Sequence, residues 1–90
     1  MLKIVMSTRF RKDLKLASRR GLHLEKLEQV VNQLAAGEPL PPENRDHLLT
    51  GDYAGFRECH ILPDWLLIYR IHEDTLCLFL FRTGTHADLF

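Results

Sequence analysis

Three apolar segments separated by two tight turns place the strongest constraint on what this chain can fold into. The segments cover residues 56–61, 65–71 and 75–82, and Pro-Asp and His-Glu-Asp sequences separate them. Apolar, β-branched and aromatic residues bounded by turn residues are typical of strands, and turns this short join antiparallel neighbours. Residues 56–82 are therefore predicted to form an antiparallel meander of three strands.

The N-terminal half has a different periodicity. Residues 2–6 alternate like a short strand. From about residue 8 to 20 apolar side chains recur at helical spacing, and Gly21 follows as a stop. A wide apolar face predicts a second helix over residues 23–36, and the Pro-rich residues 38–44 are expected to form an extended loop.

These elements predict an α+β fold with two N-terminal helices packed on one face of a twisted antiparallel sheet. Ninety residues, 46% of them hydrophobic, suffice for one modest core, so residues 1–90 are expected to form a single domain. No apolar run is long enough to cross a membrane, and the N-terminus lacks the pattern of a signal peptide. The two cysteines have no CxxC spacing, which favours reduced thiols and a cytoplasmic protein.

The charge is balanced overall but unevenly distributed. Residues 1–26 contain eight Lys or Arg and two acidic residues, whereas residues 46–90 contain three basic and seven acidic residues. A basic N-terminal third could face phosphates or an acidic partner, and a solvated helix face explains it equally well. The basic side chains expected to contact RNA are Arg9, Arg11, Lys12 and Lys15.

Three kinds of hydrolytic site can be weighed against the sequence. A zinc site is disfavoured because no HxxxH, HxH or CxxC pair occurs. A thiol nucleophile is disfavoured because Cys59 and Cys77 both lie within apolar strands. A nuclease without a metal needs only a base, an acid and cations for the phosphate. The candidates for those roles are His47, His60, Asp64, Arg82 and His86.

Other readings of these residues remain open. A lone strand histidine such as His60 is often structural. Trp65 and Phe90 could stack on a base, although a packing role explains Trp65 equally well. His23 and His72 are expected to be plain surface residues.

Two long segments of the chain resemble a known family. "RDHLLTGDYAGFRECHILPDWLLIYRI" and the terminal "FRTGTHADLF" resemble the YafQ branch of the RelE/ParE toxin superfamily. The resemblance implies an endoribonuclease that cuts translated mRNA in the ribosomal A site without a metal or other cofactor, held inactive by a cognate antitoxin. It implies that the active-site residues fall on His47, His60, Asp64, Trp65, Arg82, His86 and Phe90.

The implied chemistry is attack of a 2′-OH on the adjacent phosphate, so DNA would be bound but not cut. Arg82 would bind the phosphate, and His86 would be the general acid. The base is Asp64, His47 or His60, and the sequence does not choose among them. Gly84 is expected to let the backbone turn toward His86.

Two other functions remain possible at this point. ParE-type relatives share the fold but poison DNA gyrase by binding it. A catalytically idle, RNA-binding member of the family is the second possibility. The C-terminal segment of the antitoxin is expected to cover the basic helices or the histidines.

Overall fold

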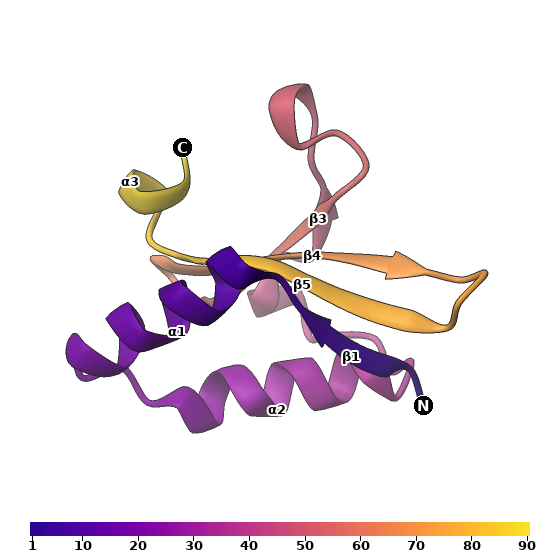
Figure 1. Cartoon of the computed structure of the whole chain (residues 1–90), viewed down its shortest axis with the longest axis horizontal. Helices are drawn as coiled ribbons and strands as arrows, with labels where there is room; N and C mark the ends of the chain where they lie inside the picture. The colour runs from indigo at the N-terminus through magenta and orange to yellow at the C-terminus, as the bar shows by residue number, and fades with distance from the viewer.

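The computed structural model describes residues 1–90 and confirms the predicted α+β fold (Figure 1). Its sheet has five strands in the order β1-β5-β4-β3-β2. Two helices lie on one face of the sheet, and a short C-terminal helix lies on the other side. The elements are β1 (Lys3–Met6), α1 (Thr8–Arg19), α2 (Leu24–Ala35), the 3-10 turn η1 (Pro42–Asn44), β2 (His47–Leu48), the 3-10 turn η2 (Gly51–Tyr53), β3 (Arg57–Leu62), β4 (Trp65–His72), β5 (Cys77–Gly84) and α3 (His86–Leu89).

The sheet is mixed rather than wholly antiparallel. The β3-β4-β5 meander is antiparallel as predicted, but β1 pairs with β5 in parallel, with Lys3 opposite Cys77 and Met6 opposite Leu80. A parallel pair needs a long crossover instead of a tight turn. Most of the chain separates β1 from β5, so no local sequence pattern predicts their pairing.

The larger core lies between the two helices and the sheet. Ser7 starts α1 by accepting a hydrogen bond from the Phe10 N–H at 2.9 Å, and its hydroxyl donates to the Phe81 carbonyl at 2.7 Å. This cap therefore fixes the helix start and attaches it to β5. The buried residues of this core are Phe10, Ala17, Leu27, Val30, Val31, Leu34, Ala35, Cys59, Trp65, Leu67, Tyr69, Leu78 and Leu80.

A smaller core lies on the opposite face of the sheet. Leu66 and Ile68 of β4 and Leu89 of α3 are buried there, and partly buried side chains of the η2 loop pack around them. The Tyr53 hydroxyl also donates to the Leu89 carbonyl at 2.9 Å. This face is only partly covered, and His47, Asp64 and His86, which are active-site candidates, are exposed.

The helix α3 at the end of the chain was not predicted from the sequence. A capping box forms it: the Thr85 hydroxyl accepts the Asp88 N–H at 3.1 Å, and the Asp88 carboxylate accepts the Thr85 N–H at 2.9 Å. Gly84 ends β5 and does not make a turn. A Cβ at Gly84 would lie 2.9 Å from Asp88 Oδ2, so glycine is needed there for close approach.

None of the helices has the length and apolar character that crossing a bilayer requires.

Candidate active site

Three histidines from separate parts of the chain surround one buried carboxylate. The side chain of Glu58 on β3 is only 6% exposed, and its Oε1 lies 3.7 Å from Nε2 of His47 and 3.6 Å from Nε2 of His60. His47 and His60 come from β2 and β3, and β2 pairs with β3 so that His47 lies opposite Glu58. The carboxylate is therefore shared between two imidazoles.

Backbone carbonyls fix which ring nitrogen of these two imidazoles carries the proton. Nδ1 of His47 lies 2.6 Å from the Arg45 carbonyl, and Nδ1 of His60 lies 3.3 Å from the Pro63 carbonyl. A carbonyl can only accept, so each Nδ1 carries the proton. Each Nε2 then carries either a lone pair or, when the ring is charged, a second N–H, and lies within 4 Å of Glu58 Oε1.

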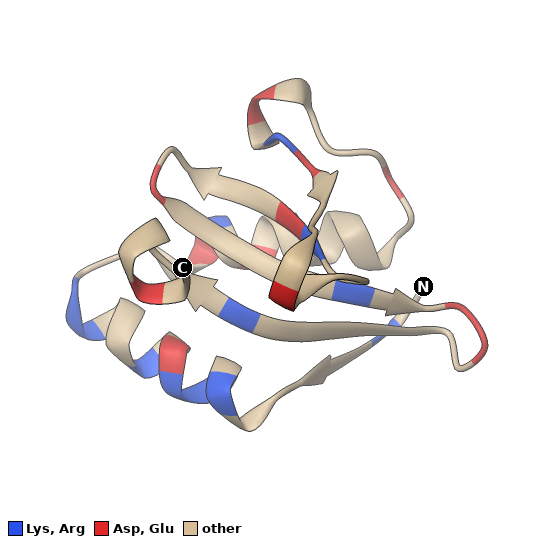
Figure 2. Ribbon diagram, turned by 90° about the horizontal axis from the view of Figure 1, so that it is seen from above, with Lys and Arg blue, Asp and Glu red and all other residues tan.

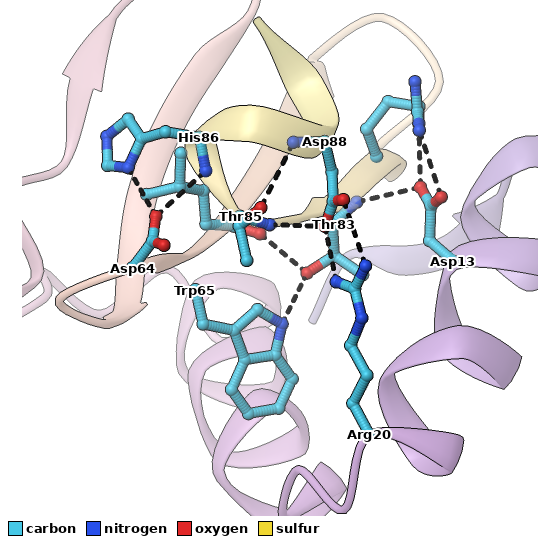
Figure 3. Close-up of polar contacts among 10 residues, drawn as sticks. Asp13, Arg20, Asp64, Trp65, Thr83, Thr85, His86 and Asp88 are labelled. Carbon is cyan, nitrogen blue, oxygen red and sulfur yellow. Dashed lines mark hydrogen bonds and ion pairs between the residues drawn. The ribbon is translucent and has the colours of Figure 1, made fainter.

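His86 forms a second polar unit with Asp64. The His86 ring donates from Nδ1 to Asp64 Oδ1 at 2.7 Å, and the His86 backbone N–H donates to the same oxygen at 3.0 Å (Figure 3). The backbone N–H and then the ring of His86 hold the pKa of Asp64 below its ordinary value. The ionised carboxylate therefore orients the ring and leaves Nε2 of His86 available.

The group formed by His47, Glu58 and His60 faces the pair formed by Asp64 and His86. The ring centroids of His60 and His86 are 5.8 Å apart, and ligand atoms of Glu58, His60 and His86 all lie within 4.8 Å of one another. An acid and a base on either side of a phosphate require this kind of opposed arrangement. The structure thus brings together His47, His60, Asp64 and His86, with Glu58 added.

The same atoms could hold a metal ion. Imidazole nitrogens with one carboxylate suit zinc or copper. The Pro63 carbonyl at Nδ1 of His60 and the Asp64 carboxylate at Nδ1 of His86 are the usual kinds of outer partner of histidine ligands. The sequence reading disfavoured a metal site because it tested only short spacings. The three ligands come from positions 58, 60 and 86, which only the folded chain brings together.

Arg82 is held by an ion pair with α1 rather than by the histidines. Its Nε and Nη2 donate to the Asp13 carboxylate at 2.8 and 3.1 Å, and the Thr83 N–H donates to Asp13 Oδ2 at 3.1 Å. The bond to Asp13 raises the pKa of Arg82, so the guanidinium stays charged. The two bonds to Asp13 use two of the five N–H groups of the guanidinium.

A second ion pair ties α1 to α3. Arg20 donates to the Asp88 carboxylate at 2.6 and 3.2 Å (Figure 3). The bond from Arg20, followed by that from the Thr85 N–H, holds the pKa of Asp88 well below its ordinary value. Because Asp88 also caps α3, this pair anchors the helix that begins with His86.

The two aromatic candidates lie in different environments. Trp65 is 2% exposed in the larger core, and its indole N–H donates to the Thr83 hydroxyl at 2.9 Å. Trp65 therefore packs, and its ring is not available to stack on a base. Phe90 is 61% exposed, and its ring centroid lies 6.5 Å from that of His86. Phe90 can stack on a nucleotide beside the histidines.

The basic candidates form a surface of their own. Lys and Arg residues follow one another along α1 in Figure 2, with Asp13 as an acidic exception. Arg9, Arg11, Lys12 and Lys15 are all exposed. They lie on α1, not among the histidines, so any contact with RNA or with a partner would extend beyond the histidine group.

The cysteines take no part in this site. Both thiols are free, and Cys59 is completely buried. Burial raises the pKa of the Cys59 thiol to about 12, so it carries no thiolate at neutral pH.

Sequence reasoning missed the residues that position the candidates. Glu58 was passed over because it lies inside a strand that reads as apolar, and Asp13 because it lies in a basic helix. A charged residue at an otherwise apolar or basic position was the available signal. Thr85 and Asp88 also fit the spacing of a capping box.

Comparison with known proteins identifies the family of the chain. Residues 2–90 match the family of the bacterial toxin of type II toxin-antitoxin systems, YafQ. The chain is 43% identical to the mRNA interferase toxin YafQ of Escherichia coli K12 over 97% of this chain and 94% of that protein.

Solved structures of similar chains share its fold. A metal-bound toxin from Helicobacter pylori is 47% identical, with a TM-score of 0.94 and full coverage of both chains. A chain of the E. coli DinJ-YafQ complex is 40% identical, with a TM-score of 0.90, and the match covers 100% of this chain and 99% of that one.

Proposed function

Because this chain belongs to the YafQ family of toxins from bacterial type II toxin-antitoxin systems, we propose that it is an endoribonuclease that cleaves mRNA in the ribosomal A site. Residues 1–90 form the single toxin domain, and the toxin acts in the cytoplasm, where mRNA is translated. The observation that carries the proposal is the pair of opposed imidazoles, His60 and His86, each with its proton position set by an oxygen acceptor.

His86 is the general acid. Its Nδ1 is bound to Asp64, so a proton on Nε2 points away from the carboxylate and can pass to the leaving 5′ oxygen. The negative charge of Asp64 stabilises the charged ring that must form first. Asp64 is thereby a positioning residue, which removes it from the three candidates for the base.

His60 is the general base. Its Nδ1 is bound to the Pro63 carbonyl, so the lone pair of the neutral ring is on Nε2 and can accept the proton of the 2′-OH. The neighbouring Glu58 carboxylate stabilises the imidazolium that results. His47, whose side chain is 49% exposed, shares Glu58 from the other side and adds positive charge near the phosphate when protonated.

The product is a 2′,3′-cyclic phosphate and a free 5′-OH. The 2′-OH oxygen bonds to phosphorus as the P–O5′ bond breaks, so no metal-bound nucleophile is required. Arg82 offers its remaining N–H groups to the charge that builds on the phosphate oxygens, and Phe90 stacks on a neighbouring base. DNA lacks the 2′-OH and is not cut.

The protein partner is a cognate antitoxin. Family membership supports it, and the E. coli relative is known in complex with DinJ. We propose that an acidic segment of the antitoxin covers the basic side chains of α1, because opposite charges complement one another there.

The proposal is tested by incubating the purified chain with translating ribosomes and mapping new 5′ ends on the mRNA. Cleavage is expected with the wild type, with and without EDTA, and should be lost in His86→Ala. His23→Ala is the matched control, because His23 is an exposed histidine at the start of α2 with no side-chain partner.

Each alternative function predicts a different result. Equal cutting by His86→Ala would overturn the acid–base assignment. Absence of new ends combined with inhibition of DNA gyrase would instead support a ParE-type toxin. Absence of both, with retained binding of mRNA, would support a catalytically idle member, and cleavage that EDTA abolishes would contradict a mechanism without a metal.

A further inference from the structure

A continuous row of aromatic rings crosses the sheet face opposite the two long helices. The rings of Phe79 and Phe81, both on β5, are 6.1 Å apart and nearly parallel, at 28°. Phe81 stacks on Phe56 at 4.7 Å and 22°. We call Phe56, Phe79 and Phe81 the aromatic row.

The aromatic row leads to the candidate active site. Tyr53 meets Phe81 edge-on at 6.2 Å and meets Phe90 edge-on at 5.3 Å, and Phe90 in turn lies 6.5 Å from His86. A path of neighbouring rings thus connects Phe79, near the β4–β5 turn, with the proposed general acid.

Cationic side chains flank the far part of the row. The Arg70 guanidinium lies 5.8 Å from the centroid of Phe56, and Arg70 is exposed. Arg70 pairs with Phe79 across β4 and β5, so both side chains leave the same face of the sheet. On the other side of β5, Lys3 is opposite Cys77 in the parallel pair and is exposed.

Packing in the two hydrophobic cores explains the position of only some rings of the aromatic row. Phe56 and Phe81 border the smaller core, but Phe79 belongs to neither core and remains partly exposed. Its neighbour on β1, Val5, is 37% exposed. A large aromatic ring held on an open sheet face beside an exposed arginine is an arrangement suited to a ligand with flat, anionic repeats.

We propose that the aromatic row and Arg70 bind nucleotides of the single-stranded RNA next to the cleavage site. Phe56 and Phe81 cover one another at 4.7 Å, so a base stacks on the partly exposed Phe79 at the open end of the row, and Arg70 and Lys3 face the phosphates. The inference rests on the proposed function, because the aromatic row leads to a cleavage site only if RNA is cut at His86. RNA is favoured over an antitoxin segment because a partner peptide has no need of stacked rings that continue to the catalytic histidines.

The probe is an RNA strand that cannot be cut. A nine-nucleotide single strand with 2′-O-methyl riboses is titrated into the isotope-labelled full chain and followed by NMR, which detects binding up to the millimolar range. The amide signals of Arg70, Phe79 and Phe81 are expected to shift together with that of Phe90. A three-nucleotide strand is expected to shift Phe90 with little effect on Phe79.

Substitutions separate stacking from packing. Phe79→Leu keeps an apolar side chain but loses the ring, and is expected to weaken binding about tenfold. Phe79→Tyr keeps the ring and should bind like the wild type. Arg70→Glu should weaken binding in a salt-dependent way, whereas Arg19→Glu, an exposed charge on α1, serves as the matched control.

The outcomes are separable from those for the proposed function, because the methylated strand is bound and not cut. Any of three outcomes would overturn the inference. The amide shifts could be confined to other surfaces, Phe79→Leu could bind as tightly as the wild type, or the antitoxin and not RNA could shift the signals of the aromatic row. Loss of cleavage in His86→Ala tests the catalytic assignment alone. Cleavage that survives in His86→Ala, with the row still binding RNA, would refute the mechanism and leave the binding surface standing.

Discussion

At the scale of single residues, the site depends on oxygen atoms that decide where protons lie. Carbonyls hold Nδ1 of His47 and His60, and a carboxylate holds Nδ1 of His86. In each ring Nε2 forms no hydrogen bond and is available to a ligand. A histidine without such a partner would sample both tautomers and several ring orientations, so the partners matter as much as the histidines.

Asp64→Asn tests the positioning role of Asp64. The amide oxygen can still accept from Nδ1 of His86, but the negative charge that stabilises the charged ring is lost. We expect the cleavage rate to fall by about 10- to 100-fold, with binding of the methylated RNA strand unchanged. Single-turnover cleavage on ribosomes measures the rate. A parallel fall in RNA binding would show that Asp64 contacts RNA directly.

Asp88→Asn should make the stability of the protein depend less on pH. The pKa of Asp88 is lowered in the folded chain, so its ionised form stabilises the fold above its ordinary pKa of 3.8, and this stabilisation is lost as the pH falls toward the folded value. We expect the variant to be about 1 kcal/mol less stable at pH 7. The difference from wild type should shrink at pH 3.

Urea unfolding at the two pH values measures this difference. Asp52→Asn is the matched control, since Asp52 is exposed and forms no ion pair. An Asp88→Asn difference that is as large at pH 3 as at pH 7 would show that the carboxylate charge is not what stabilises α3.

At the scale of elements, the short helix α3 decides where His86 lies. A four-residue helix is too short to be stable by itself. Its capping box, the buried Leu89, the bond from Tyr53 and the ion pair with Arg20 hold it against the sheet. α1 thus supports the site at two points, because Asp13 on the same helix holds Arg82.

Removal of residues 86–90 should therefore leave a folded chain that does not cut RNA. The larger core contains no residue of α3, so it stays intact. The loss of Leu89 from the smaller core is expected to cost about 2 kcal/mol. Circular dichroism and urea unfolding measure folding, and the ribosome assay measures cleavage. Retained cleavage would mean that the tail is only structural.

At the scale of the whole molecule, the chain presents two different surfaces. The partly open sheet face carries the histidines and the aromatic row, whereas the exposed side of α1 carries consecutive positive charges (Figure 2). The proposals place RNA on the first and the acidic antitoxin segment on the second. An antitoxin bound to α1 would lie beside Asp13 and the C-cap residue Arg20, which hold Arg82 and Asp88.

Charge reversal tests the antitoxin surface. Replacing Arg9, Arg11 and Lys15 by Glu is expected to weaken binding of the cognate antitoxin by on the order of tenfold or more at low salt. The difference should narrow at 1 M salt, where charges are screened within about 3 Å. Calorimetric titration measures the affinity, and Lys26→Glu on α2 is the control. Unchanged affinity would place the antitoxin elsewhere.

The sequence by itself determined the elements whose signals are local. Apolar periodicity marked both long helices, and turn residues marked the meander, although the second turn lies at residues 73–76 and not at the predicted 72–74. Neighbouring residues set helix and turn preferences, so a single sequence suffices to show them.

Only the tertiary structure decided how these parts meet. The parallel pairing of β1 with β5, the ion pair between Asp13 and Arg82, and the placing of Glu58 between His47 and His60 join segments that no local pattern relates. The tertiary structure also shows that Trp65, a site candidate in the sequence, is buried in the larger core, and that Gly84 is a point of close packing against Asp88. Such contacts depend on how the whole core packs, because burial and long-range pairing, not neighbouring residues, supply their free energy.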